Sequence, residues 1–176
     1  SAMIYCLASS EQKCSYKKLG YIDDITALKT SSNYYQFMTA IKLTGNNYKN
    51  NMKLNATEEH FNTYRNTFKE FGLGATTGID LDNESLGIIG PKIADDLLLN
   101  LSIGQYDTYT LLQLTNYINT IATKGSRYSL HYLNLVKNQN KIIYEHNPKL
   151  LNKIEDSGYF DRITEGFKQV VYYGTG

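Results

Sequence analysis

The sequence FGLGATTGIDLDNESLG runs from Phe71 to Gly87. It holds four glycines, three of them within seven residues, and then three carboxylates at alternate positions, Asp80, Asp82 and Glu84. Glycine-rich loops can cradle phosphates, and alternating carboxylates can bind calcium. The stretch therefore has features of a phosphate loop and of a calcium loop.

Neither kind of site fits. A Walker loop requires Lys and then Ser or Thr after its last glycine, whereas Ile79 and Asp80 follow Gly78. A dinucleotide-binding loop follows a strand, but a phenylalanine-rich helix is predicted just before this stretch. An EF-hand requires glycine at its sixth position, which here is Ser85. The stretch predicts a helix stop, a tight turn and a short extended segment.

The composition is that of an ordinary globular chain. The sequence has 176 residues, 41% of them hydrophobic and 20% charged, with a net charge of +1. This balance gives no electrostatic reason to expect a nucleic-acid or membrane-surface partner. No apolar run approaches the length that spans a bilayer. Residues 1–3 read as a cloning remnant followed by a start methionine.

Helix signals recur along the chain. Apolar residues at helical spacing and capping residues at the ends predict five helices and a further short helix or turn. Their ranges are 23–30, 33–44, 57–72, 110–125 and 156–174, with the short element at 94–104. Ser32 or Asn33 is the expected cap of the second helix. In the helix at 110–125, Thr110 and Gln113 form a capping box, and the expected buried stripe is Leu111, Leu114, Ile118 and Ile121.

One β-hairpin is predicted near the C-terminal end. YSLHYLNLV at 128–136 and KIIYEH at 141–146 are joined by a polar turn. No internal repeat and no linker are visible within the chain.

Isolated reactive residues give weak signals. His60, His131 and His146 are scattered, so no metal site and no cofactor are predicted. Cys6 and Cys14 fit no zinc spacing, and they could pair with each other or remain two thiols. Ser-x-x-Lys occurs at Ser10–Lys13 and Ser15–Lys18, but this polar segment does not supply the apolar surroundings that would activate a lysine. Both matches are interpreted as chance.

Four separated stretches together carry more information than any one of them. They are SSN at 31–33, the glycine-rich stretch at 71–87, SIGQYDTYTLLQLTNYINTIATKG at 102–125 and EGFKQVVYYGTG at 165–176. In this order and spacing they resemble the transpeptidase domain of class B penicillin-binding proteins. The resemblance covers nearly the whole chain from about Tyr5. It implies that Phe71–Gly87 is a structural loop, in which Gly74 and Gly78 allow close approach or positive φ and Glu84 ties the loop down.

The resemblance also implies roles for two residues of the Ser-x-Asn motif. Ser31 would be the hydroxyl that relays a proton between the catalytic lysine and the leaving nitrogen. Asn33 would be the catalytic amide that also binds the substrate backbone and steadies the lysine. Taken alone, Ser31, Ser32 and Asn33 favour a helix cap and no more. Together with the other three stretches, the catalytic roles are favoured instead.

The sequence departs from the family pattern in several places. The nucleophilic Ser-x-x-Lys would lie several dozen residues before the Ser-x-Asn motif, and the Lys-Thr-Gly strand would follow Gly176, so both are expected outside this chain. Tyr106 stands where the family has glycine, and Leu111 where it has proline. These two changes leave the local loop shape open.

The implied fold is mainly α with one β-hairpin. It would be the helical subdomain of the β-lactamase/transpeptidase-like α/β fold, the serine D,D-peptidase fold, with most of the central sheet missing. The expected division of one partial domain is 1–3, a terminal remnant; 4–30, a leading segment; 31–125, a helical subdomain with Ser-x-Asn; and 126–176, the hairpin and C-terminal helix.

The implied function is that of a peptidoglycan D,D-transpeptidase fragment. The partners would be stem peptides and β-lactams, and the parent protein would work on the extracytoplasmic face of the bacterial membrane, with this chain a soluble piece of it. Two alternatives stay open. One is a β-lactam-sensing or catalytically inactive domain of the same fold, and the other is a helical interaction module.

We predict that this chain alone does not become acylated, because the expected nucleophile and the Lys-Thr-Gly strand are not in it. Incubation with a fluorescent penicillin, followed by intact-mass analysis, should show no covalent adduct. A stoichiometric adduct on Ser10 or Ser15 would overturn the interpretation of those Ser-x-x-Lys matches as chance.

We also predict association. A helical layer without its sheet leaves an apolar face uncovered, and exposed apolar patches of several hundred Å² usually drive association. A homodimer or a domain-swapped form is expected in sedimentation velocity at increasing protein concentration. A monomer throughout the concentration range would contradict this expectation.

Overall fold

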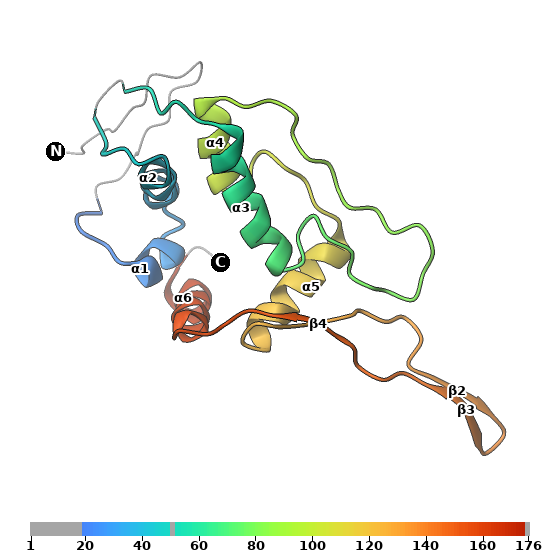
Figure 1. Ribbon diagram of the computed structural model, residues 1–176. Coiled ribbons are helices and arrows are strands. Elements are labelled where there is room, and N and C mark those ends of the chain that lie inside the picture. Colours follow the sequence, from blue (N-terminus) through green and yellow to red (C-terminus); the bar gives the residue numbers. More distant parts are fainter. Residues whose placement is uncertain (1–18, 50–51, 175–176) are drawn as a thin grey trace. The chain divides into compact units, whose positions relative to one another are not determined.

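The computed structural model describes residues 19–49 and 52–174 (Figure 1). Cys6, Cys14 and both Ser-x-x-Lys matches lie outside the described residues. The chain divides into two compact units. Unit 1 comprises residues up to Tyr64, Ile89–Thr108 and the chain from Asp161, and unit 2 comprises Arg65–Ile88 and Tyr109–Phe160.

Helices dominate the fold, as the sequence predicts. The described residues form six of them: α1 (Asp24–Lys29), α2 (Asn33–Leu43), α3 (Glu58–Glu70), α4 (Asp95–Ser102), α5 (Leu111–Ala122) and α6 (Tyr159–Tyr173). The short element expected at 94–104 is a true helix, α4. None of the helices in the described part of the chain is both long enough and apolar enough to cross a bilayer.

Unit 1 is built around an apolar core. The buried side chains come from α1, α2, α3 and α4 and include Phe37, Ile41, Phe61, Leu98 and Leu99. α2 packs against α4. The Asp95 carboxylate, in the first turn of α4, accepts hydrogen bonds from Leu54 N at 2.7 Å and Ala56 N at 2.8 Å, which fixes the segment that leads into α3.

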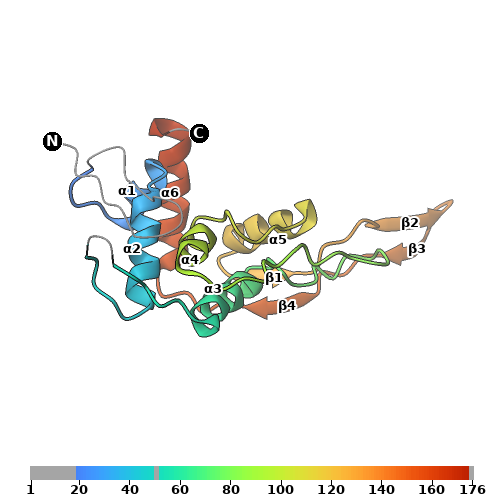
Figure 2. The same ribbon diagram turned by 90° about the horizontal axis from the view of Figure 1, so that it is seen from above.

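Unit 2 contains the strands. β1 (Ser126–Tyr128) pairs antiparallel with β4 (Leu150–Lys153), and β2 (Leu135–Asn138) pairs antiparallel with β3 (Lys141–Glu145). The predicted hairpin is therefore present as β2–β3. The start of its expected first strand instead joins β4, which carried no clear sequence signal. The β2–β3 ribbon projects from the rest of unit 2 in both views (Figures 1 and 2).

The faces of α5 are the reverse of the sequence expectation. Its capping box forms as predicted between Thr110 and Gln113. The buried residues of the helix, however, are Gln113, Asn116, Thr120 and Ile121. Of the predicted apolar stripe only Ile121 is buried, while Leu111, Leu114 and Ile118 are 82%, 42% and 52% exposed. The expected stripe was wrong for those three residues.

Hydrogen bonds explain why the polar face of α5 is inside. Gln113 Nε2 donates to the carbonyl oxygen of Ala75 at 3.0 Å, and Asn116 Nδ2 donates to that of Tyr128 at 2.7 Å. The first bond holds the glycine-rich loop and the second holds β1. Burial of an amide costs little when its hydrogen bonds are made. α5 thus connects two backbone segments that no strand ladder joins to each other.

We predict that Asn116→Ala lowers the free energy of unfolding by about 1–3 kcal/mol, because it leaves a buried carbonyl without its donor. The matched control is Asn119→Ala on the same helix. Asn119 is half-buried, and its side chain makes no hydrogen bond to the described residues. The control should change stability by less than about 0.5 kcal/mol. Chemical denaturation gives both values, and equal losses in the two variants would contradict the assigned role of Asn116.

Candidate functional site

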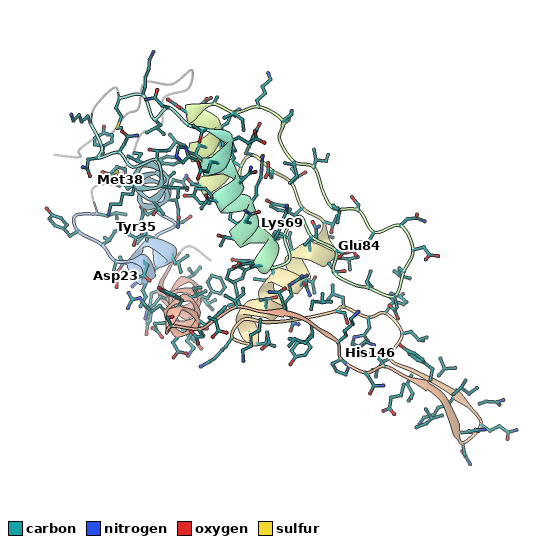
Figure 3. All side chains as sticks on the ribbon, viewed as in Figure 1. Asp23, Tyr35, Met38, Lys69, Glu84 and His146 are labelled. Atoms are coloured by element: carbon teal, nitrogen blue, oxygen red, sulfur yellow. The ribbon has the colours of Figure 1, made fainter. Side chains whose placement is uncertain are left out.

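The candidate segment Ser31–Asn33 lies where α1 ends and α2 begins. Asp23 caps α1, and its side chain accepts a hydrogen bond from Thr26 N at 2.9 Å. It ends in a Schellman arrangement, because Ser31 N donates to Leu28 O at 3.0 Å and Ser32 N donates to Ala27 O at 2.9 Å. The position of the segment is therefore fixed by main-chain bonds. Asp23 and Tyr35 mark the beginnings of the two helices in Figure 3.

Ser31 has a left-handed backbone, with φ of +50°. This is the position after a helix where glycine is strongly favoured and a residue with Cβ pays a steric cost. The turn itself therefore does not call for serine. A non-glycine residue in a strained conformation is a reason to look for a role of its side chain.

Ser32 is the residue that caps α2. Its Oγ accepts a hydrogen bond from Tyr35 N at 3.3 Å. Asn33 is the first residue of the helix. The sequence left Ser32 and Asn33 as alternative caps, and the structure assigns the cap to Ser32.

The side chains on either side of the cap have no hydrogen-bond partner among the described residues. Ser31 and Asn33 are both exposed, and neither side chain makes a hydrogen bond with any part of the chain that the structure describes. A hydroxyl and a carboxamide thus flank the capping serine, and each is available to a ligand or to another part of a larger protein.

The end of α6 lies beside the same joint. A Cβ placed on Gly174 would lie 2.6 Å from the carbonyl oxygen of Lys29, and Lys29 Nζ lies 5.1 Å from the centroid of the Tyr173 ring. Further along α6, Arg162 forms ion pairs with Asp23 and Asp24. Its hydrogen bond to Asp24 lowers the pKa of that carboxyl group. α6 is thus attached at both ends of α1.

The glycine-rich stretch is structural, as expected. Gly72, Gly74 and Gly78 all have positive φ, between 69° and 98°. At Gly72 a Cβ would lie 2.6 Å from Asn116 Oδ1, so only glycine leaves room for the buried amide. Glu84 accepts a hydrogen bond from Thr77 N at 2.7 Å and so ties the loop down.

Asp80 makes a second tie within the same loop. Its two carboxylate oxygens accept from Tyr132 N at 2.6 Å and Leu133 N at 2.9 Å. These main-chain donors lower the pKa of Asp80. Two of the three carboxylates that could have suggested a metal loop, Asp80 and Glu84, thus accept hydrogen bonds from backbone N–H groups.

Tyr106, which departs from the family pattern, has a defined partner. Its hydroxyl accepts from Lys92 N at 2.7 Å and donates to Lys92 O at 2.6 Å. The ring occupies the space beside Gly90, where an added Cβ would lie 2.2 Å from it. The neighbouring Asp107 is buried and accepts from Gly90 N at 2.9 Å. Tyr106, although it departs from the family pattern, therefore holds residues 90–92 in place.

The histidines form no metal centre. His60 Nδ1 accepts from Thr57 N at 3.1 Å and helps to begin α3. His131 and His146 stack with ring centroids 3.7 Å apart, a pairing that their sequence separation did not reveal. No group of three or more His, Cys, Asp or Glu side chains within residues 19–49 and 52–174 could hold a metal ion.

Comparison with known proteins identifies the family. Residues 8–176 match the family model described as the penicillin binding protein transpeptidase domain. Penicillin-binding protein 2A of Bacillus subtilis (strain 168) is 37% identical over 98% of this chain and 25% of its own length. Penicillin-binding protein H of the same organism is 41% identical over 93% of this chain and 24% of its own length.

A solved structure agrees with these relatives. The chain matches penicillin-binding protein 2B from Streptococcus pneumoniae (strain 5204) with a TM-score of 0.84 and 32% identity, covering 97% of this chain and 30% of that one. The chain therefore belongs to the penicillin-binding protein transpeptidase domain family. Within that family it resembles the class B proteins, as the four sequence stretches predicted.

The chain spans about a quarter of the length of the curated relatives it matches. The predicted fold class is confirmed, since the described residues form the mainly helical part of a transpeptidase domain with short strands.

Sequence reasoning missed the polar network of unit 2. Gln113, Asn116 and Thr120 recur on one face of α5 at spacings of three and four residues, and Arg127 follows in β1. The sequence signal for this network was a polar stripe at helical spacing beside the apolar stripe of α5. The sequence of the helix itself does not tell which of the two stripes packs against the rest of the protein.

Proposed function

We propose that this chain is part of a peptidoglycan D,D-transpeptidase in which Ser31 and Asn33 serve the reaction. The observation that carries the proposal is the pattern at the start of α2. Ser32 caps the helix there, and the two side chains that flank it are exposed and make no hydrogen bond to the described residues. A helix start needs only one cap, so the capping role does not account for Ser31 and Asn33.

In the proposed reaction, a serine in the part of the parent protein that precedes this chain attacks the amide carbonyl of D-Ala–D-Ala. The C–N bond breaks, D-alanine leaves with a proton on its nitrogen, and the acyl group passes to an amine of a neighbouring stem peptide. β-Lactams resemble the dipeptide and leave a stable acyl-enzyme. Such chemistry requires an activated nucleophile and a positioned proton donor.

Ser31 would supply the proton path. Its hydroxyl can accept a proton from the catalytic lysine while donating its own to the leaving nitrogen, so that no net charge accumulates on the serine. The Asn33 carboxamide has both a donor and an acceptor. It can bind the substrate backbone and hold the lysine ammonium at the same time.

The end of α6 supports this placement. Gly174 lies against the carbonyl of Lys29, two residues before Ser31. In the resembling family the Lys-Thr-Gly strand follows this tail. A strand that continues from Gly174 would therefore begin close to the proposed proton relay. The parent protein would act on stem peptides and β-lactams at the extracytoplasmic face of the bacterial membrane.

A β-lactam-sensing or inactive domain is the second candidate. Such a protein would keep Ser31 and Asn33 exposed and bind a β-lactam without turning over a peptide. Release of D-alanine from a D-Ala–D-Ala peptide by the parent protein distinguishes the two candidates, since only the transpeptidase would release it. The third possibility was a helical interaction module, and it required the resemblance to the family to be accidental. Because the chain belongs to the family, that requirement is not met.

We predict that in the parent protein Ser31→Ala slows acylation by penicillin by roughly 10²–10⁴-fold, the usual range for loss of a positioned acid–base group. Asn33→Ala should slow acylation and also weaken binding of the peptide, because substrate polar groups lose a partner. Stopped-flow acylation measures the rates. Unchanged rates in both variants would exclude the catalytic assignment.

Two controls separate chemistry from folding. Ser32→Ala should cost about 1 kcal/mol of stability through loss of the cap and leave acylation of the folded protein unchanged. Ser31→Gly relieves the left-handed strain, so it should raise the melting temperature while slowing acylation as much as Ser31→Ala does. A Ser31→Gly protein that acylates at the normal rate would show that the hydroxyl is not needed.

A further inference from the structure

Unit 2 contains a polar cavity of its own. A cavity of about 690 Å³ opens between the end of α3, the glycine-rich loop and the β1–β4 ribbon. Its lining includes the polar or charged residues Lys69, Glu70, Arg127, Asn152, Lys153 and Glu155. Lys69 is labelled on α3 in Figure 3. The volume is within the range of small-molecule sites.

Arg127 is the half-buried cation of this cavity, and its hydrogen-bond partners within residues 19–49 and 52–174 are all neutral. Its Nε donates to Asn152 Oδ1, and its Nη1 donates to Thr76 O at 3.0 Å and, at 3.5 Å, to Asn116 Oδ1. Among the described residues Arg127 makes no ion pair, and none of its hydrogen bonds uses Nη2. One end of the guanidinium fork therefore remains available.

The charge of Arg127 is also incompletely compensated. Burial lowers its pKa, and the more distant charge of Glu84 offsets this only in part. Glu84 itself accepts from Thr77 N through Oε1. A residue needed only to bridge a carbonyl and two amide oxygens would not have to be charged. A half-buried cation without a close counter-ion has lost part of its hydration, and a bound anion would compensate for that loss.

The other charges of the cavity leave a positive balance. Lys69, Arg127 and Lys153 face Glu70 and Glu155, three positive charges against two negative ones. Both lysines are exposed, so their flexible ammonium groups can reach an anion seated on the guanidinium. Arginine binds carboxylate and phosphate through paired N–H donors, and lysine adds a point charge.

We propose that this cavity is an anion site that binds a small ligand through one carboxylate or phosphate group. Nη2 of Arg127 is the anchoring donor, and Lys69 and Lys153 close around the bound group. The site is independent of the proposed transpeptidase residues, none of which lines it.

The test is a titration of the 176-residue chain, ¹⁵N-labelled, at constant ionic strength maintained with sodium chloride. Inorganic phosphate and acetate are the two probes. Saturable shifts are expected for the amides of Arg127, Asn152 and Lys153 with at least one probe. Tighter phosphate binding indicates a phosphorylated ligand, and tighter acetate binding indicates a carboxylate ligand. The absence of saturable shifts with both probes would overturn the proposal.

Variants locate the site. Arg127→Lys keeps the charge but loses the fork, and it should weaken binding about tenfold. Because Arg127 also donates to Thr76 and Asn116, its substitution changes the fold as well as the site, so Lys69→Ala and Lys153→Ala provide the decisive pair. Each should weaken binding by about three- to tenfold with an unchanged melting temperature. The control Lys137→Ala, on β2 outside the cavity, should bind normally. Equal affinity in Lys69→Ala, Lys153→Ala and Lys137→Ala would exclude the site.

Discussion

The carboxamides on the buried side of α5 are the contacts on which unit 2 depends. Gln113 reaches a carbonyl of the glycine-rich loop, and Asn116 reaches a carbonyl of β1. Neither segment has enough strand pairing to satisfy these groups, because the sheets of the described residues have two strands each. Buried polar groups are expensive unless they are paired, so this small set of bonds fixes where the loop and the strand lie. Gly72 is glycine for the same reason, since it makes room for Asn116.

Much of the fold could be predicted from the sequence because it is specified locally. Capping residues and terminal glycines predicted the positions of the helices closely. The capping box of Thr110 and Gln113 is present as expected. The polar turn between two β-rich runs gave the β2–β3 hairpin. The orientation of α5 could not be predicted, because the helix has both a polar and an apolar stripe and burial depends on what surrounds it. β4 was missed for a related reason, since Leu150–Lys153 becomes a strand only by pairing with distant β1.

The candidate site shows the same division. The roles of Ser31 and Asn33 were predicted from the family resemblance. The composition of the chain and the spacing of its residues do not indicate those roles. Which serine caps α2 depended on backbone geometry, which the sequence left open between Ser32 and Asn33. In the structure Ser32 caps the helix. The structural role therefore belongs to Ser32, and the proposed chemical roles belong to its neighbours Ser31 and Asn33. For the glycine-rich loop, resemblance and geometry agree that Glu84 ties the loop down, and the structure adds Asp80, which also accepts from main-chain donors.

The Schellman joint between α1 and α2 has a bearing on how such a domain can evolve. The joint is closed by carbonyls of Ala27 and Leu28 and by amide groups of Ser31 and Ser32, so it requires no side chain at position 31 or 33. Substitutions at those two positions would be nearly invisible to selection for stability, and a glycine at position 31 would even be favoured by it. A lineage that no longer needed the chemistry could therefore lose it in single steps without passing through a misfolded intermediate. Persistence of serine and asparagine in a large set of orthologous sequences would, by the same reasoning, report selection on activity alone.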